Sequence, residues 1–335
     1  MPLVEETQLT AKPAASELEG QLEHHRGELT AYCYRMLGSP FEAEDAVQET
    51  LIRAWRGYDR FEGRAALRSW LYRIATNVSL DMLNGRERRA RPMDLGPSWN
   101  PDGPIGRQLP EVTWIEPLPD GLVAAREGDP AEVAVTRETI RLAFVAALQH
   151  LPPRQRAVLI LCEVLRWQAT EVAELLETSV ASVNSALQRA RATLEASNVS
   201  AFDASTSVDQ ADAEMLARYV DAFERYDMDA LTSLIHEDAT QSMPPYELWL
   251  TGRDDIFRWW LGRGAGCRGS RVIPTVSANG SPAFGQYKPT DSGDGYVPWA
   301  LQVLEIKAGR IAEFTFFLDT EHVFPLFGLP LQFPG

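Results

Sequence analysis

Two segments of this chain are poor material for a helix or a strand, and they divide it into three blocks. The first, 92–130, carries eight prolines and several glycines but few aliphatic residues, and the second, 196–212, is rich in Ser, Ala and Asp. A chain of 335 residues is also too long for one ordinary domain and long enough for two or three. We therefore predict domains at 16–95, 132–197 and 213–335, joined by linkers at 96–131 and 198–212.

The composition is that of a globular protein kept in a reducing compartment. Hydrophobic residues make up 45% of the chain and charged residues 24%, which excludes disorder throughout. No apolar run approaches the roughly twenty residues of a membrane helix, and the start of the chain lacks the pattern of a secretory signal. The three cysteines, Cys33, Cys162 and Cys267, are odd in number and far apart, which argues against disulfides and indicates the cytoplasm.

The net charge of −15 lies mostly in the last third of the chain. Residues 201–335 hold 19 acidic and 10 basic side chains, a net of −9, whereas residues 1–95 are at −2 and residues 132–200 are neutral. A strongly acidic protein is normally a poor nucleic-acid binder, but this distribution leaves the first two blocks able to be one. Their cations are nearly all arginine, which favours planar contacts to phosphate or carboxylate.

The first block has the periodicity of helices that bury one face. Apolar residues recur at helical spacing over 46–55 and again over 67–78, with a polar glycine loop between the two stripes. In the first of these helices Asp45, Gln48 and Glu49 share the opposite face, which could dock a basic partner helix or could simply be solvated. A basic cluster follows the second helix: Arg86, Arg88, Arg89 and Arg91.

The second block predicts a short helix at 170–176, a tight turn, and a longer helix at 180–194, with Thr178 or Ser179 as the cap between them. The apolar positions of the longer helix share one face. Polar and basic side chains cover the other face: Ser182, Asn184, Ser185, Gln188, Arg189 and Arg191. This pattern is typical of a helix-turn-helix, although many small helical bundles share it.

The third block changes from helical periodicity, at 214–235, to short β-prone runs. These runs lie at 248–250, 272–276, 296–306 and 311–318. The residues 307–310 predict a turn between the last two runs. Helices followed by an antiparallel meander indicate an α+β domain with a curved sheet.

The order of these parts resembles the sigma-70 class of bacterial RNA polymerase initiation factors, specifically the small extracytoplasmic-function (ECF) group. The resemblance covers roughly 20–195. It rests on four stretches, DAVQET at 45–50, RSWLYRIATN at 68–77, LPPRQRAVLIL at 151–161, and the residues 171–191. Their order and spacing make the match specific. The resemblance implies two all-α helical sigma domains, of which the second is a helix-turn-helix domain.

The resemblance also implies roles in the first domain. Asp45, Gln48 and Glu49 would bind the polymerase core through its β and β′ subunits. The loop 62–67 would accept a base flipped out of the −10 element, while neighbouring side chains touch the strand or its phosphates. The residues with this −10 role would be Arg64, Arg68, Trp70, Arg73, Asn77, Arg86, Arg88 and Arg89. Trp70 also lies on the apolar stripe, so packing in the core is its other interpretation.

In the second domain the polar face of the longer helix would meet the −35 element: Ser182, Asn184, Ser185, Gln188, Arg189 and Arg191. Asn and Gln can read adenine edges, and Arg can read guanine or hold phosphate. The sequence departs from the family at Ala181, where Gly is usual, and at Ala186, where Arg is usual. The acidic Trp- and Pro-bearing stretch 111–119 is similar to the linker motif of sigma factors with a SnoaL-like domain. It would cross the polymerase channel, or serve only as a tether.

The third block, from about 213, resembles the SnoaL-like domain, a cone-shaped α+β fold. Relatives of this fold include polyketide cyclases, which use a pocket Asp and His. The candidates of that kind here are Asp221, His236, Asp319 and His322. No firm catalytic signature accompanies them. We therefore favour a regulatory domain that packs on the sigma domains over a ligand-sensing pocket, and both over an enzyme.

The sequence thus predicts a cytoplasmic sigma factor that binds core polymerase, recognises the −35 and −10 elements of promoter DNA and promotes transcription initiation. The C-terminal domain would modulate this activity by contact with the sigma domains. We expect no enzymatic activity, cofactor, metal or membrane contact. Two alternatives stay open. One is a bifunctional protein whose last domain is a small-molecule sensor or a cyclase-like enzyme, and the other is a stand-alone DNA-binding regulator that uses only the helix-turn-helix.

Overall fold

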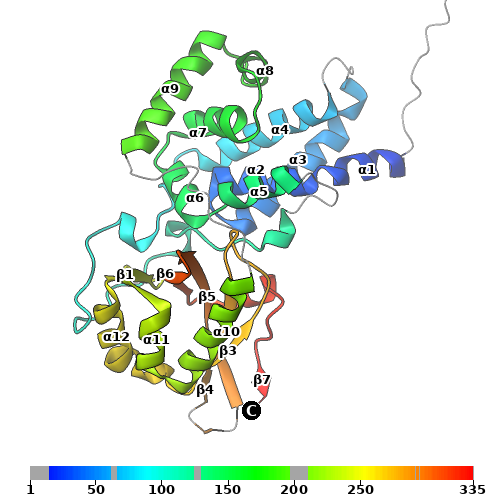
Figure 1. Cartoon of the computed structure of the whole chain (residues 1–335). Coiled ribbons are helices and arrows are strands. Elements are labelled where there is room, and N and C mark those ends of the chain that lie inside the picture. Colours follow the sequence, from blue (N-terminus) through cyan, green and yellow to red (C-terminus); the bar gives the residue numbers. More distant parts are fainter. Residues whose placement is uncertain are drawn as a thin grey trace, which may run out of the picture.

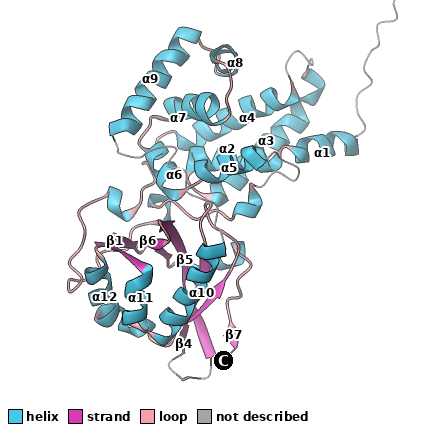
Figure 2. Cartoon of the chain, in the orientation of Figure 1, coloured by secondary structure: helices cyan, strands magenta, loops and turns pink. Residues whose placement is uncertain are grey.

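The computed structural model describes residues 15–61, 66–123, 130–196, 210–290, 292–293 and 295–334 of the chain. Helices fill one end of the molecule, and a sheet with its own helices fills the other (Figure 1, Figure 2). The segment 92–123 runs down the side of the sheet domain and returns to the helices. No helix among the described residues is long and apolar enough to span a bilayer.

The first domain is helical, as the periodicity predicts. Its helices are α1 (Ala15–His24), α2 (Arg26–Leu37), α3 (Pro40–Gly57), the short η1 (Tyr58–Arg60) and α4 (Leu67–Leu83). The side chain of Ser39 accepts a hydrogen bond from the Glu42 N–H at 3.3 Å, and Pro40 occupies the first turn of α3. The left-handed Gly38, at φ 78°, ends α2, so the chain can reverse between α2 and α3.

The second domain contains the predicted helix-turn-helix. Its elements are α5 (Pro130–Thr139), α6 (Leu142–Gln149), α7 (Pro153–Leu159), the π-helical turn η5 (Ile160–Val164), α8 (Ala169–Leu175) and α9 (Val180–Ala196). The predicted cap between the last two helices is Ser179, whose Oγ accepts a hydrogen bond from the Ser182 N–H at 3.1 Å. Glu177 makes the tight turn in the left-handed region, at φ 51°.

The third domain is a seven-stranded sheet with helices on both faces. Its helices are α10 (Gln210–Arg225), α11 (Met228–Leu234), α12 (Arg253–Leu261), η6 (Arg263–Cys267) and α13 (Thr320–Leu326). Its strands are β1 (Ile235–Ser242), β2 (Trp249–Thr251), β3 (Arg271–Pro274), β4 (Ala283–Pro289), β5 (Gly295–Lys307), β6 (Arg310–Phe317) and β7 (Phe333–Pro334). The strand order is β2-β1-β6-β5-β4-β3, and β7 pairs with β5. The predicted α+β class is confirmed, as is the turn at 307–310.

The predicted antiparallel meander is wrong in two respects. β1 and β4 were not expected, and β1 pairs with β6 in parallel. The polar sequence of β1, IHEDATQS, has no clear two-residue alternation, so only its neighbours in the fold make it a strand. The helical segment predicted at 214–235 is present as two helices, α10 and α11, separated at Tyr226, which has φ 57°. α12 was also not expected.

The sheet buries both of its faces. On β5, Ala300 and Leu304 belong to the core under α10, α11 and α12, whereas Leu301 and Val303 belong to the core that runs through both helical domains. Successive side chains of a strand point to opposite faces, so the outer face of the sheet packs directly toward the helices of the first two domains.

The linker is hydrogen-bonded to the rest of the chain along most of its length. The Trp99 N–H donates to the carbonyl of Trp249 at 2.8 Å, and the Leu109 N–H donates to that of Pro245 at 2.9 Å. Three short 3-10 turns flank this stretch. η2 (Pro92–Asp94) precedes it, and η3 (Glu111–Thr113) and η4 (Asp120–Leu122) follow it. The chain returns to the first domain where the Glu116 N–H donates to the Gly38 carbonyl at 3.0 Å. A loose tether would not make these bonds.

Candidate polymerase and nucleic-acid interfaces

The face of α3 that was predicted to bind polymerase is open to solvent. Asp45 and Gln48 are exposed, and the half-buried Glu49 pairs with Arg53 at 2.7 Å. Ile52 and Trp55 continue the same helical face and are 37% and 45% exposed. This apolar part was not predicted, although its i+4 and i+7 spacing from Gln48 places it on the same face. Exposed aromatic and aliphatic side chains beside a polar rim are typical of protein–protein contacts.

All six residues predicted to meet the −35 element are exposed on α9: Ser182, Asn184, Ser185, Gln188, Arg189 and Arg191. Val183, Ala190 and Leu194 anchor the opposite face in the core. Arg191 is held in an ion pair with Glu163. Arg189 makes no ion pair with any residue that the structure describes. The helix therefore presents a polar surface with one arginine that is free to reach a phosphate or a base edge.

The arginines of α4 are half-buried and contact the second domain. Arg68 pairs with Glu28 at 2.7 Å, and its guanidinium lies over the rings of Tyr72 and Trp167, at 5.1 and 5.7 Å from their centroids. Arg73 donates to the carbonyl of Glu174 at 3.1 Å. Two of the residues predicted to touch the −10 element are therefore occupied by contacts that involve the helix-turn-helix domain.

Trp70 packs in an aromatic cluster. Its ring stacks on that of Phe61 with 4.9 Å between centroids and lies near Tyr58. This arrangement agrees with packing, the other interpretation of Trp70. Asn77 is exposed on α4, while Arg64 lies outside the described residues.

The basic cluster after α4 is only partly available to DNA. The exposed Arg86 and Arg88 contact Glu42 and His150, respectively. Arg89 is only 6% exposed and donates to the Trp114 carbonyl at 2.5 Å. In this arrangement Arg89 is therefore covered and not open to a phosphate. The linker folds back over Arg89 and covers it. A local sequence pattern cannot show this contact, because the two segments are far apart in the chain.

Arg89 also pairs with two carboxylates, Glu42 at 3.2 Å and Glu116 at 3.4 Å. Burial raises the pKa of Glu116 to about 7, against the opposing effects of the Ser39 hydroxyl and the Arg89 cation. The linker is thus held to the first domain by a buried cation and by a carboxyl group that titrates near neutral pH.

Asn279 connects every part of the molecule. It is fully buried at the tip of the loop between β3 and β4. Its amide nitrogen donates to the Tyr34 hydroxyl of α2 at 2.7 Å and to the Ile140 carbonyl of the second domain at 2.6 Å. Its amide oxygen accepts from the Leu118 N–H of the linker at 2.8 Å. The Asn-Gly pair at 279–280 is a hairpin signal that would have predicted this turn, but no local signal predicts what it touches.

None of the four residues predicted to line a pocket of the third domain lines the cavity found between its sheet and α12. Asp221 is exposed and pairs with Arg225 at 2.6 Å, and the His236 ring accepts the Asp238 N–H at 3.1 Å. Asp319 and His322 pair at 2.9 Å near Glu111 of the linker, and Asp319 holds the pKa of His322 above its ordinary value. Each has a local partner, and the four residues do not come together at one site.

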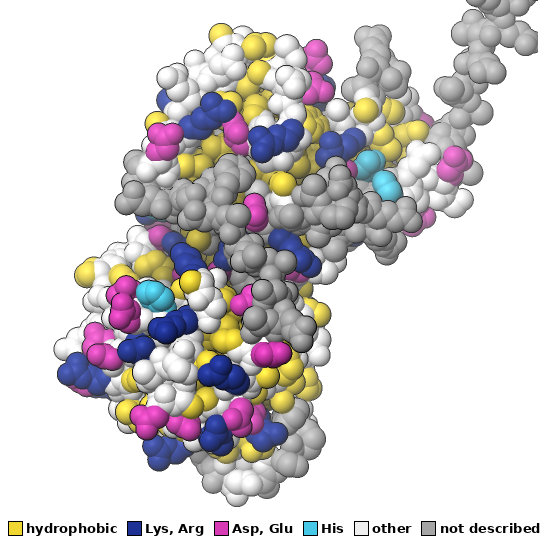
Figure 3. Space-filling model, viewed as in Figure 1, with side chains coloured by type: hydrophobic (Ala, Val, Ile, Leu, Met, Phe, Trp, Pro, Cys, Tyr) yellow, Lys and Arg dark blue, Asp and Glu magenta, His cyan; other side chains and the backbone are white. Residues whose placement is uncertain are grey.

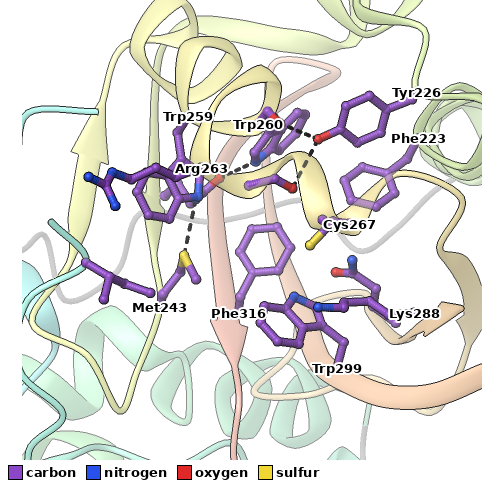
Figure 4. A pocket seen from close by; sticks show the side chains of 15 residues that line it. Phe223, Tyr226, Met243, Trp259, Trp260, Arg263, Cys267, Lys288, Trp299 and Phe316 are labelled. Atoms are coloured by element: carbon purple, nitrogen blue, oxygen red, sulfur yellow. Dashed lines mark hydrogen bonds between the residues drawn. The ribbon is translucent and has the colours of Figure 1, made fainter. Parts of the chain in front are cut away.

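The cavity of the third domain lies elsewhere, between the sheet and α12. It has a volume of about 270 Å³. Figure 4 shows that its walls are mainly aromatic, with Phe223, Trp259, Trp260, Trp299 and Phe316 around a common space. Among the residues that the structure describes, no Asp, Glu or His lines it. The acid–base pair that a cyclase of the expected kind uses is therefore missing from this cavity.

Family descriptions match all three domains: Sigma-70 region 2 at residues 22–89, Sigma-70 region 4 at 141–194, and a SnoaL-like domain at 216–314. The chain is 46% identical to the ECF RNA polymerase sigma factor SigG of Mycobacterium tuberculosis, over 94% of this chain and 84% of the relative. It is 30% identical to SigJ of the same organism, over 88% of both chains. The crystal structure of SigJ superposes over 93% of this chain and 99% of its own with a TM-score of 0.58, at 22% identity.

Together the fold and these matches define a protein of the sigma-70 class whose third domain is SnoaL-like. Within that class, the chain belongs to the ECF RNA polymerase sigma factors. This membership agrees with the main prediction from the sequence. The relatives are named as sigma factors, whose role is not enzymatic.

Proposed function

We propose that this sigma factor docks on core polymerase, through its β and β′ subunits, with the α3 face formed by Asp45, Gln48 and Glu49, and reads the −35 element with α9. The observation that supports this is a contrast in exposure. Both faces are open to solvent, whereas Arg68 and Arg73 of α4 are engaged by contacts that reach the second domain. In this proposal the described arrangement is a closed form of the protein. The protein acts with the polymerase in the cytoplasm after the domains separate.

The C-terminal domain and the linker hold this closed form. Arg141 of the second domain pairs with Glu305 of β5, and Asn279 reaches both helical domains. On the face in Figure 3, basic and acidic side chains are interspersed over the C-terminal domain, so the closure rests on specific contacts more than on one charged patch. Release of the domains would free α4 for the −10 element.

The polymerase face can be tested with the double variant Asp45→Ala/Gln48→Ala. These side chains make no contact that the fold needs, so the variant should fold normally but bind core polymerase at least about tenfold more weakly. Promoter-dependent transcription in vitro should fall in parallel. The measurement is a titration of labelled sigma factor with core enzyme.

Asp254→Ala, which removes an exposed carboxylate on α12, is the control and should leave core binding unchanged. Equal core binding by the double variant and the wild-type protein would rule out this face. A second candidate function is that of a small-molecule sensor, which the aromatic cavity of the third domain favours.

A further inference from the structure

The cavity of the third domain is large enough for a small organic molecule. It measures about 270 Å³. An apolar cavity of about 150 Å³ in another protein holds one benzene ring, so this volume suits a body of about two fused rings. Trp259 and Trp260 of α12 are 4% and 5% exposed, which places the cavity's α12 wall inside the domain. Ile105 of the linker completes the lining.

The charged groups of the lining are all cations. They are Arg263 and Lys288. The segment 201–335 has 19 acidic against 10 basic side chains, so a lining without a carboxylate departs from its surroundings. Burial raises the pKa of the Tyr226 hydroxyl to about 12 and also raises that of the Cys267 thiol, so both groups are neutral at pH 7.

Lys288 is the cation that lies among the aromatic rings. It is half-buried on β4, and its Nζ is 3.8 Å from the centroid of the Trp299 ring (Figure 4). No carboxylate pairs with it among the described residues. Arg263, by contrast, is exposed and donates to the Asp102 carbonyl of the linker at 3.4 Å. An ammonium group against an aromatic wall with no counter-ion favours an anion beside it.

A second polar group of the lining has bonding capacity left. Gln241 is 1% exposed, and its amide oxygen accepts the Trp260 indole N–H at 2.7 Å. Within the described part of the chain, its amide nitrogen donates to the sulfur of Met243 alone, at 3.6 Å, and sulfur is a weak acceptor. A buried amide with an N–H group that meets no oxygen would gain from an acceptor atom on a bound molecule. Gln286, in comparison, is satisfied by Ser270 and Gln302.

We infer that this cavity binds a compact apolar carboxylic acid of about two fused rings, whose carboxylate pairs with the Lys288 ammonium while its rings pack among the tryptophans. The walls supply apolar and aromatic contact, Lys288 supplies the charge, and Gln241 supplies a hydrogen-bond donor. The site carries out no reaction. The inference goes beyond the proposed function and does not depend on it, because binding can be measured without polymerase or DNA.

The test compares acids with their neutral amides on the intact chain by titration calorimetry. The probes are 2-naphthoate, indole-3-acetate and 4-phenylbutyrate, each beside its primary amide, which keeps the size and the ring. At least one acid should bind with one-to-one stoichiometry, and at least about tenfold more tightly than its amide, because it gains a charge-assisted hydrogen bond. Equal binding of acid and amide, or no binding by any of the three acids, would overturn the inference.

Lys288→Met removes the charge and keeps the aliphatic stem. It should lower the affinity for the acid by at least about tenfold and leave that for the amide unchanged. Lys307→Met, at the exposed end of β5, is the matched control and should change neither. An unchanged affinity of Lys288→Met for the acid would place the acid elsewhere. The comparison of acid and amide on the wild-type protein decides the matter even if this variant fails to fold.

Discussion

At the scale of single residues, buried cations join parts of the chain that are far apart in sequence. Arg156 of α7 is 3% exposed and donates to the Met36 carbonyl at the end of α2, and also to the Gln149 side chain at 2.6 Å. Carbonyls at the end of a helix carry partial negative charge, so they can replace a carboxylate as partners. Burial lowers the pKa of Arg156 to about 10, which still leaves it charged at neutral pH.

Glu116 makes the stability of the linker contact depend on pH. Its pKa is raised in the folded protein to about 7, mainly by burial, so the folded state binds the proton more tightly than the unfolded chain. The stabilising contribution of this proton is complete below about pH 4.5 and is lost as the pH rises through 7. We predict that the unfolding free energy of the wild-type protein, relative to that of Glu116→Gln, falls by about 1–3 kcal/mol between pH 5 and pH 8.

Urea titrations of both proteins at pH 5, 6, 7 and 8 measure this difference. Other titrating groups are common to the two proteins and cancel in the comparison. A difference that stays constant over this range would show that Glu116 is ionised throughout, and that its partner Arg89 outweighs its burial.

At the scale of elements, α9 and α4 offer DNA two different surfaces. The polar face of α9 is uncovered, whereas α4 lies against the second domain. Within α9, neighbouring residues differ in what they can recognise. An amide reads adenine through two hydrogen bonds, while an arginine can hold a phosphate whatever the base.

We therefore predict different effects for Gln188→Ala and Arg189→Ala. Gln188→Ala should relax the base preference at one −35 position, at a cost of about 1–3 kcal/mol for the preferred base. Arg189→Ala should weaken binding to all promoters alike and lower the dependence of affinity on salt. Holoenzyme binding to a randomised −35 library at two salt concentrations measures both effects. Arg166→Ala is the control, because that exposed arginine lies outside α9. Identical selected sequences for Gln188→Ala and the wild-type protein would exclude base reading by Gln188.

At the scale of the whole molecule, one loop holds three domains and the linker together. Asn279 stands in the left-handed region, at φ 54°, where Asn is tolerated better than most residues. Its neighbour Gly280, at φ 74°, has no room for a Cβ, which would lie 3.0 Å from the Arg137 carbonyl. The turn can therefore insert between the helical domains only with this Asn-Gly pair or a close substitute.

We predict that Asn279→Gly loosens the closed form without straining the turn, because glycine accepts positive φ. It removes the hydrogen bonds of the Asn279 side chain to the buried Leu118 N–H and Ile140 carbonyl and one of the two bonds of the Tyr34 hydroxyl, which still donates to the Glu116 carbonyl, at a cost of about 2–4 kcal/mol. Small-angle scattering should show a larger radius of gyration, and transcription from a selected promoter should rise. Asn100→Ala, which loses only a local bond to the Asp102 N–H, is the control. An unchanged radius of gyration would mean that the closure rests elsewhere.

The sequence alone was sufficient for features that repeat locally. Helical periodicity in 46–55 and 67–78 and the polar face of α9 follow from spacing within a few turns of chain, and the structure bears them out. The division into three blocks stays a prediction, because Ile115 and Leu118 of the proline-rich segment are buried in the same core as the helical domains.

Contacts between distant residues needed the folded chain. The burial of Arg89, the four-way position of Asn279, the strand β1 and the cavity beside Lys288 each join segments separated by tens to hundreds of residues. The cavity residues predicted from the sequence failed for this reason, because Asp221 and His322 have suitable chemistry but lie on the outside of the domain. The chemistry of each side chain follows from its residue type. Burial and proximity depend on which surfaces pack together, and packing is a property of the whole fold.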